Sequence, residues 1–185
     1  MPGVVGLFTS VFHFFTAYYF QETPPNPSLK SLAMKNIVIL GASHAGASTA
    51  HRILKQASKT APFKITLVSP NTDIYWNMAA PRAAIRVYGD EKVFQPIAPG
   101  FKQYGDKFES VVGTAQSLDV QAKTVGLADG KTLEYDFLIL STGSRTKEVT
   151  PFKGLGSTEE TKKALHTFRE KVKESKTIVT AAHRY

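Results

Sequence analysis

The chain has 185 residues, of which 42% are hydrophobic and 21% are charged, and this balance excludes an intrinsically disordered protein. It contains no cysteine, which excludes disulfides, thiolate metal sites and cysteine nucleophiles within these residues. The formal net charge is +8, and lysine is densest in residues 147–176. Glutamates alternate with the lysines in this segment, so a solvated helix face explains the charge better than a nucleic-acid-binding surface does.

Residues 1–34 differ in character from the rest of the chain. Residues 3–20 are apolar and aromatic, and no lysine or arginine precedes Lys30, so the positive start of a secretory or mitochondrial signal is missing. Helical spacing would gather the aromatic side chains on one face, as in a helix that lies in a membrane interface. The alternative is a leader without a structural role, with the domain starting at Met34. We expect a cytoplasmic protein, with membrane association through residues 3–20 or a mitochondrial location as alternatives.

A strand–turn–helix–strand unit is predicted from Lys35 onward. Residues 36–40 are a short apolar run, as in a strand that is buried on both faces of a parallel sheet. Residues 41–46 predict a glycine-containing turn, residues 47–57 a helix with small residues in its first turns, and residues 63–68 a second strand. Together these elements predict a βαβ unit of near minimal length.

Antiparallel strands are predicted in the middle of the chain. Residues 110–119, 123–127 and 132–135 have the composition of strands, and the Asp-Gly pair at 129–130 is typical of a hairpin turn between the last two. Residues 137–140 are a further apolar run and predict another buried strand.

A polar helix is predicted over residues 158–175, with Ser157 as its amino-terminal cap. Residues 176–180 then predict the start of one more strand. We therefore expect a first nucleotide-binding segment over residues 35–156 and a linker helix with the start of a second domain over residues 157–185.

The turn after the first strand has the pattern of a dinucleotide-binding site. Gly41 permits the tight turn out of the strand, and Gly46 lets the helix pack close to the sheet. A pyrophosphate would lie on the N–H groups at the start of the helix, where the helix dipole favours negative charge. Two residues depart from the usual pattern: Ser43 replaces the middle glycine, and Ser69 stands where an acidic residue normally binds the ribose.

Ser43 has a second interpretation, as the nucleophile of a hydrolase elbow. That elbow normally follows several strands of a central sheet, whereas here the turn follows the first strand of the domain. The required histidine and acidic partners also lack a recognisable context, since His51, His166 and His183 are isolated in the sequence. The nucleotide-binding interpretation is therefore preferred.

Three segments together resemble the pyridine nucleotide–disulfide oxidoreductase superfamily. They read NIVILGASHAGASTAHRIL, ITLVSPNTDIYWNMAAPRA and EYDFLILSTGSR, and they lie within residues 36–145. Within the superfamily they look like the apoptosis-inducing-factor-like and ferroptosis-suppressor-like flavoproteins, fungal members above all. The resemblance implies an α/β fold: a Rossmann-like FAD-binding domain with a parallel sheet, helices and a small antiparallel β meander, incomplete at its carboxyl terminus.

The resemblance also assigns FAD-contacting positions to individual residues. The turn would bind the pyrophosphate, Ser69 the ribose, Arg82 the cofactor through its guanidinium, and Ala115 the adenine through its backbone. Thr142 and Gly143 belong to the motif Ser-Thr-Gly that closes the first FAD segment. The implied cofactor-binding residues are Gly41, Ser43, His44, Ala45, Gly46, Ser69, Arg82, Ala115, Thr142 and Gly143.

The activity implied by the resemblance is electron transfer from NAD(P)H through flavin to a quinone or another small acceptor. FAD carries the chemistry, so no acid, base, nucleophile or metal ligand is assigned. The family continues with a second glycine motif and with later strands that complete the FAD site, and neither follows residues 176–180 here. We therefore expect no NAD(P)H site in these residues and weak FAD affinity. The alternative is a catalytically inactive nucleotide-binding module.

Overall fold

The computed structural model describes residues 34–56, 62–147 and 150–179. The chain divides into a unit of residues Met1–Leu32 and a unit of residues Ala33–Tyr185, and the description below concerns the second. The interfacial helix expected over residues 3–20 lies outside the described residues. In the described ranges no helix is both long enough and apolar enough to cross a membrane.

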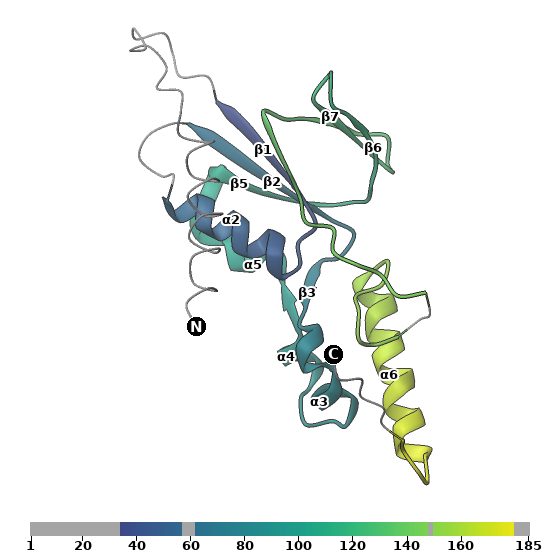
Figure 1. The fold of residues 1–185 in the computed structure, drawn as a ribbon. Helices are drawn as coiled ribbons and strands as arrows, with labels where there is room; N and C mark the ends of the chain where they lie inside the picture. Colours follow the sequence, from purple (N-terminus) through teal and green to yellow (C-terminus); the bar gives the residue numbers. More distant parts are fainter. Residues whose placement is uncertain (1–33, 57–61, 148–149, 180–185) are drawn as a thin grey trace, which may run out of the picture. The chain divides into compact units, whose positions relative to one another are not determined.

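A four-stranded parallel sheet forms the centre of this unit (Figure 1). The strands lie in the order β5-β2-β1-β9, so the chain builds outward from β1 in one direction and then returns to its other side. Residue Ile37 pairs with Ile65 on β2 and with Phe137 on β9. The strands are β1 (Lys35–Leu40), β2 (Phe63–Ser69), β5 (Phe108–Val112) and β9 (Phe137–Leu140).

Each face of the sheet has its own covering layer, because side chains of a strand alternate between the faces. Helices α2 (His44–Gln56) and α5 (Ile97–Phe101), together with the 3₁₀ helix η2 (Lys102–Lys107), cover one face. Figure 1 shows α2 and α5 on the same side of the strands. The buried cluster on this side includes Ile39, Leu54, Ile65, Leu67 and Phe101. The predicted helix begins three residues earlier than expected, at His44.

A small antiparallel sheet packs on the opposite face and confirms the expected meander. It consists of β6 (Ala115–Asp119), β7 (Thr124–Leu127) and β8 (Thr132–Glu134). Its buried contacts with the main sheet join Val125 and Leu127 to Val38, Leu40 and Val68. With the parallel sheet, the helices and this meander in place, the α/β Rossmann-like fold class is confirmed.

The prediction of one antiparallel strand over residues 110–119 is wrong. The segment contains two strands, because the chain leaves β5 after Val112 and crosses to the small sheet at Ala115. The amide of Gly113 donates to the carbonyl of Ser69 at 2.8 Å, which holds the crossing residues beside the end of β2. Strand β5 is parallel to β2, a pairing between residues far apart in sequence that local patterning does not reveal.

A second group of elements lies beyond the ends of the strands. Its longest member is α6 (Thr158–Glu174), which packs on α3 (Ala80–Ala84). The observed helix ends one residue before the predicted end at Ser175. The Ser157 hydroxyl accepts from the Glu160 amide at 3.1 Å, as the predicted cap requires. The remaining members are β3 (Asp73–Tyr75), η1 (Asn77–Ala79), α3 (Ala80–Ala84), α4 (Asp90–Val93) and β4 (Phe94–Pro96).

Two further predictions are wrong in part. Strand β9 is not buried on both faces: Phe137 is 60% exposed and Leu140 64% exposed, because β9 lies at an edge of the four-stranded sheet. Residues 176–179 form no strand, and Val179 is 87% exposed. A strand needs a hydrogen-bonding neighbour, and the described residues offer none there. Thr180, where the predicted strand continues, lies outside the described residues.

Candidate functional site

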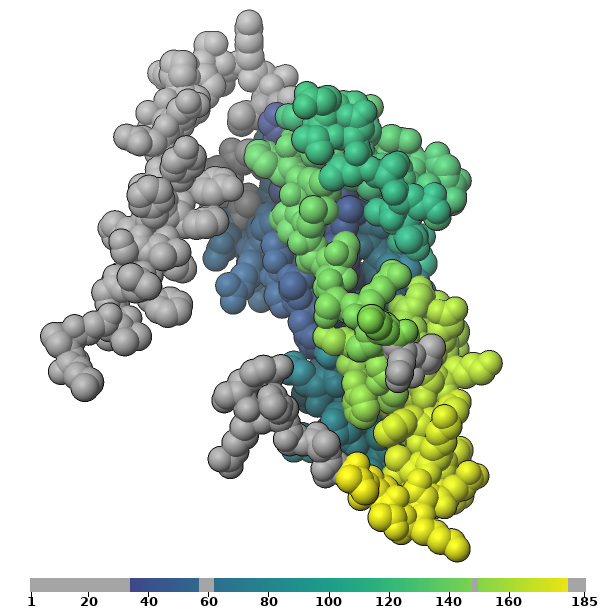
Figure 2. All heavy atoms as spheres, turned by 45° about the vertical axis from the view of Figure 1, so that its right-hand side comes forward, coloured from purple at the N-terminus to yellow at the C-terminus, as the bar shows by residue number. Residues whose placement is uncertain are grey.

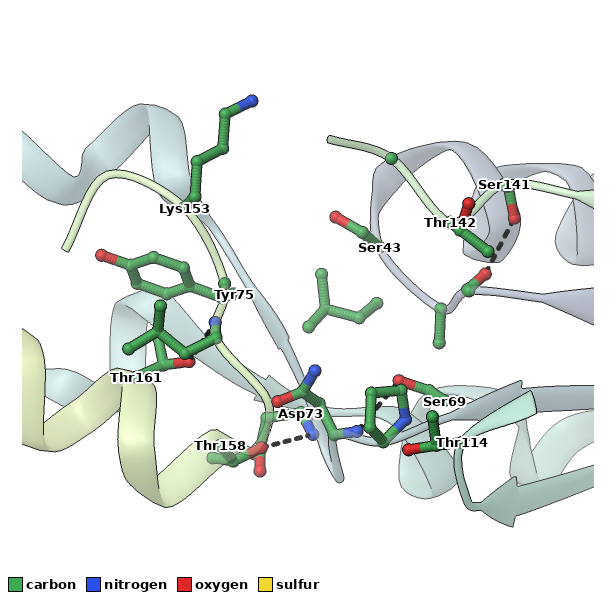
Figure 3. A pocket seen from close by; sticks show the side chains of 18 of the residues that line it. Ser43, Ser69, Asp73, Tyr75, Thr114, Ser141, Thr142, Lys153, Thr158 and Thr161 are labelled. Atoms are coloured by element: carbon green, nitrogen blue, oxygen red, sulfur yellow. Dashed lines mark hydrogen bonds between the residues drawn. The ribbon is translucent and has the colours of Figure 1, made fainter. Parts of the chain in front are cut away.

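A cavity of about 360 Å³ lies at the carboxyl ends of the parallel strands (Figure 3). Its wall contains residues that end or follow all four strands: Leu40–Ser43, Val68–Asn71, Gly113–Ala115 and Ser141–Arg145. Strands β1 and β9 are neighbours in the sheet although about one hundred residues separate them, so the order of strands reverses between them. In open α/β sheets this reversal point is where ligands bind.

Two glycines shape the turn at the edge of this cavity. Gly41 has φ +101°, which side-chain-bearing residues rarely adopt, and a Cβ there would lie 2.3 Å from the carbonyl oxygen of Ser141. A Cβ on Gly46 would lie 1.8 Å from the carbonyl oxygen of Gly41. The turn therefore closes against the helix and against β9 only when both positions are glycine.

Ser141 joins the exits of β1 and β9. Its amide donates to the carbonyl of Leu40 at 2.8 Å, and its hydroxyl lies 2.9 Å from the carbonyl oxygens of both Leu40 and Gly41. The next two residues, Thr142 and Gly143, then line the cavity, and Gly143 has φ +71°. The Ser-Thr-Gly motif thus connects two strands in addition to leading the chain past the cavity.

Helix α2 begins at this cavity. Ser43, immediately before the helix, is exposed and lines the cavity, whereas Gly46 is buried beneath the turn. The first N–H groups of a helix have no partners within the helix, and the helix dipole adds a partial positive charge there. This end of α2 therefore presents hydrogen-bond donors suited to an anionic group such as a pyrophosphate.

Ser69 occupies the end of β2, where the usual fingerprint has an acidic residue. Its side chain is buried and lines the cavity, and its hydroxyl oxygen accepts from the Asn71 amide at 3.1 Å. The Ser69 hydroxyl donates no hydrogen bond to the other described residues, so its proton is available to a ligand. Ser69 is thus a neutral donor at the position of a carboxylate acceptor.

The opposite wall of the cavity comes from the segment around α6, which sequence reasoning missed. Figure 3 shows Lys153, Tyr75 and Thr161 on one side and Ser43 and Thr142 on the other. The Lys153 ammonium donates to the Ser144 hydroxyl at 3.1 Å, and both residues line the cavity. No local motif marks these residues: Tyr75 lies on β3, whereas Lys153 and Thr161 lie just before and in the first turn of α6, which packs on α3.

Tyr75 is held in this wall with its hydroxyl donating to the carbonyl of Pro151. Burial raises the pKa of Tyr75 to about 12, with a further contribution from the nearby Asp90 carboxylate and an opposing one from Arg169. The phenol is therefore neutral at physiological pH and acts as a donor that connects β3 to the segment before α6.

The structure brings six of the ten predicted cofactor-binding residues to the cavity wall. These are Gly41, Ser43, Ser69, Ala115, Thr142 and Gly143.

The other four predicted residues lie elsewhere. His44 and Ala45 are exposed in the first turn of α2, and Gly46 supports the turn from below. Arg82 is exposed on α3, where its guanidinium lies 6.0 Å from the centre of the Tyr88 ring and outside the cavity wall. Its predicted contact with FAD stays a prediction.

The hydrolase interpretation of Ser43 finds no support in the described hydrogen bonds. His51 is bonded to the Tyr104 hydroxyl at 2.9 Å and stacks on Phe101, and burial together with Lys55 lowers its pKa. His166 pairs with Asp90. Among the described residues, no histidine is bonded to Ser43 as a general base would be.

The known relatives of this chain include two fungal oxidoreductases. The oxidoreductase ptaL of Pestalotiopsis fici is 55% identical over 153 residues, covering 79% of this chain and 41% of that protein. The oxidoreductase phnG of Penicillium herquei is 33% identical over 159 residues, covering 80% of this chain and 38% of that protein. The chain therefore spans about two fifths of the length of these curated relatives.

Among solved structures, the chain is similar to the sulfide:quinone oxidoreductase of Aquifex aeolicus. The two are 27% identical with a TM-score of 0.63, and the match covers 76% of this chain and 32% of that one. Residues 35–180, which include the glycine turn, the whole parallel sheet and all of α6, match the model of the pyridine nucleotide-disulphide oxidoreductase family. The chain belongs to the pyridine nucleotide-disulphide oxidoreductase family.

Proposed function

We propose that the chain is the FAD-binding portion of an oxidoreductase that passes electrons from NAD(P)H through flavin to a quinone or another small acceptor. The observation that carries the proposal is the cavity at the strand-order reversal, with the start of α2 at its edge. Family membership supports the use of FAD and a pyridine nucleotide.

The residues at the cavity suit FAD in shape and in donors. The turn has no room for side chains at Gly41 and Gly46, so it closes tightly and α2 starts at the cavity beside the Ser43 hydroxyl. The first N–H groups of a helix have no partners within it and are free to bind a ligand. These groups would hold the pyrophosphate, Ser69 would donate to the ribose, and the backbone of Ala115 would contact the adenine. Thr142 and Gly143 would flank the cofactor. When bound, FAD supplies the hydride-accepting chemistry.

The electron acceptor is inferred from a relative of known name and from the amino-acid composition of this chain. The sulfide-quinone reductase of Aquifex aeolicus is 30% identical over 111 residues, which supports a quinone-type acceptor for this chain as well. None of the 185 residues is a cysteine, so no disulfide within them can accept electrons.

We further propose that the protein belongs with the apoptosis-inducing-factor-like and ferroptosis-suppressor-like flavoproteins, which the motif around Trp76–Ala83 supports. We also propose that residues 3–20 contact a membrane, which their aromatic composition supports.

Flavin binding is tested by titrating the purified 185-residue chain into FAD and following flavin fluorescence and the visible spectrum. Ser43→Glu places a carboxylate where the pyrophosphate would lie and should weaken binding at least about tenfold through like-charge repulsion. Ser48→Glu is the matched control, because Ser48 is exposed on α2 and away from the cavity wall. A wild-type chain that leaves flavin fluorescence unchanged would contradict the proposal.

Turnover is tested separately, by adding NADH or NADPH and a soluble quinone to the flavin-loaded chain. Oxidation of the nicotinamide with reduction of the quinone supports the full activity. Flavin binding without turnover supports the alternative, a nucleotide-binding module that is inactive in this length of chain.

A further inference from the structure

The far wall of the cavity depends on how α6 is held. Lys153, Gly154, Leu155, Thr158 and Thr161, all in or just before the first turn of α6, line the cavity. None of them belongs to a strand of the parallel sheet, so the sheet does not position them. Local hydrogen bonds hold part of this wall, since the amide of Asp73 donates to the Thr158 hydroxyl at 3.3 Å and Lys153 donates to Ser144. The direction in which α6 leaves the wall depends on its contacts with α3 and with Asp90 of α4, which lie farther along the helix. Figure 2 shows α6, in yellow, running away from the sheet region.

One side chain provides most of the polar contacts between α6 and these short helices. Arg169, whose side chain is only 12% exposed, lies with Nη1 2.8 Å from Oδ1 of Asp90. Its Nε donates to the carbonyl of Ala83 at 2.8 Å, and its Nη2 donates to the carbonyl of Tyr88 at 3.4 Å. A planar guanidinium that binds three partners fixes both the rotation of α6 and its position along its own axis.

Asp90 receives a second contact from the same helix. Nε2 of His166 lies 2.6 Å from its Oδ2, so one carboxylate binds two side chains of α6. Leu165, which is fully buried against Ala83 and Phe94, lies between these polar contacts and the cavity. The apolar contact alone permits sliding of a helix, whereas the ion pair of Arg169 with Asp90, its hydrogen bond to Ala83 and the His166–Asp90 hydrogen bond together favour a single register.

We propose that Asp90 and Arg169 are positioning residues for the cofactor, which hold α6 in the register that places Thr158, Thr161 and Lys153 in the cavity wall. This inference rests on the proposed function, since it takes FAD as the occupant of the cavity. The two residues touch no part of the cavity themselves and act through the helix. By reciprocity, FAD that binds against this wall must also stabilise the docked position of α6.

The test compares FAD affinity among folded chains. Arg169→Met and Asp90→Asn should each weaken FAD binding by about tenfold, and the double variant should weaken it by less than the product of the two effects, because both changes break the shared Asp90–Arg169 contact. Arg169→Lys, which retains the positive charge, should recover part of the affinity. Lys131→Met is the control, because it breaks an exposed ion pair with Asp129 in the β7–β8 turn.

Circular dichroism and melting temperature establish that each variant is folded at the temperature of the titration. A lower melting temperature with unchanged FAD affinity means that the pair is merely structural and overturns the inference while leaving the proposed function intact. A wild-type chain that does not bind FAD overturns both.

Hydrogen exchange on the wild-type chain gives an independent readout that survives even if a variant fails to fold. FAD should slow amide exchange at residues 158–161 and also at residues 165–172, which lie beyond the cavity wall. If FAD slowed amide exchange only in the glycine turn and left exchange in α6 unchanged, the inference would be overturned.

Discussion

Gly46 and Gly41 are in contact across the turn that starts α2, with so little space that a Cβ on Gly46 would lie 1.8 Å from the carbonyl oxygen of Gly41. The same Cβ would lie 2.6 Å from the Ser141 hydroxyl, so the helix, β1 and β9 meet at this one position. The glycine that the dinucleotide-binding pattern requires is therefore also the residue on which the central packing depends.

Gly46→Ala should accordingly destabilise the protein by about 1–3 kcal/mol, because three backbone segments must move apart. The free energy of unfolding in denaturant measures the effect. Gly100→Ala in α5 is the matched control: its Cβ would meet no atom within 4 Å, so stability should change by less than about 1 kcal/mol. Equal stability of the two variants would mean that the close approach at Gly46 does not exist in solution.

Ser69→Ala should weaken binding of FAD about fivefold, since one hydrogen bond from a buried hydroxyl contributes about 1 kcal/mol. A fluorescence titration with FAD measures the change. Ser110→Ala on β5, outside the cavity wall, should leave the affinity unchanged. Undiminished FAD affinity in Ser69→Ala would show that Ser69 does not contact the ribose.

Asp90 should make the stability of the α6 contact sensitive to acid. Burial by itself would raise the pKa of Asp90, but hydrogen bonds from His166 and Arg169 outweigh it and hold the pKa below the ordinary value of 3.8. A carboxyl with a lowered pKa stabilises the folded state above its unfolded pKa, and that contribution is lost as pH falls through the folded value.

The difference in unfolding free energy between wild type and Asp90→Asn should therefore be largest near about pH 7 and shrink below about pH 4. Asp106→Asn, at an exposed carboxyl with no ion pair among the described residues, should show no comparable trend. A difference that stays constant with pH would show that Asp90 is not the titrating group.

Tyr75→Phe should destabilise the protein by about 1 kcal/mol at neutral pH, because the buried hydrogen bond to Pro151 is lost. The pKa of Tyr75 is raised to about 12 by burial, from an ordinary value of 10.0, so the neutral phenol is favoured in the folded state. Its contribution is complete below about pH 10 and declines as pH rises toward 12.

Denaturant unfolding of wild type and Tyr75→Phe at neutral and alkaline pH measures this decline. Tyr135→Phe serves as the control, since the Tyr135 hydroxyl has no hydrogen bond among the described residues. If the two variants have the same stability at neutral pH, the Tyr75–Pro151 hydrogen bond contributes nothing.

Local chemistry made much of the site predictable from sequence. A short apolar run followed by Gly41 and Gly46 indicates a strand, a turn and a helix start, because glycine conformation and hydrophobic periodicity act within a few residues. The cap at Ser157 is predictable for the same reason. Ser43 and Ser69 departed from the fingerprint in sequence, and the structure still places both in the cavity wall.

Only the tertiary structure decided which distant segments meet. Residues 110–119 look like one strand, yet their first part pairs with β2 and their last part with β7, since strand pairing depends on neighbours far away in the chain. In the sequence, α6 likewise shows only a few apolar residues among many charged ones, and this pattern does not indicate what the helix packs against. Its docking through Leu165 and Arg169 brings Thr158 and Thr161 to the cavity, because burial and ion pairing are defined by what packs against a residue, not by its sequence neighbours.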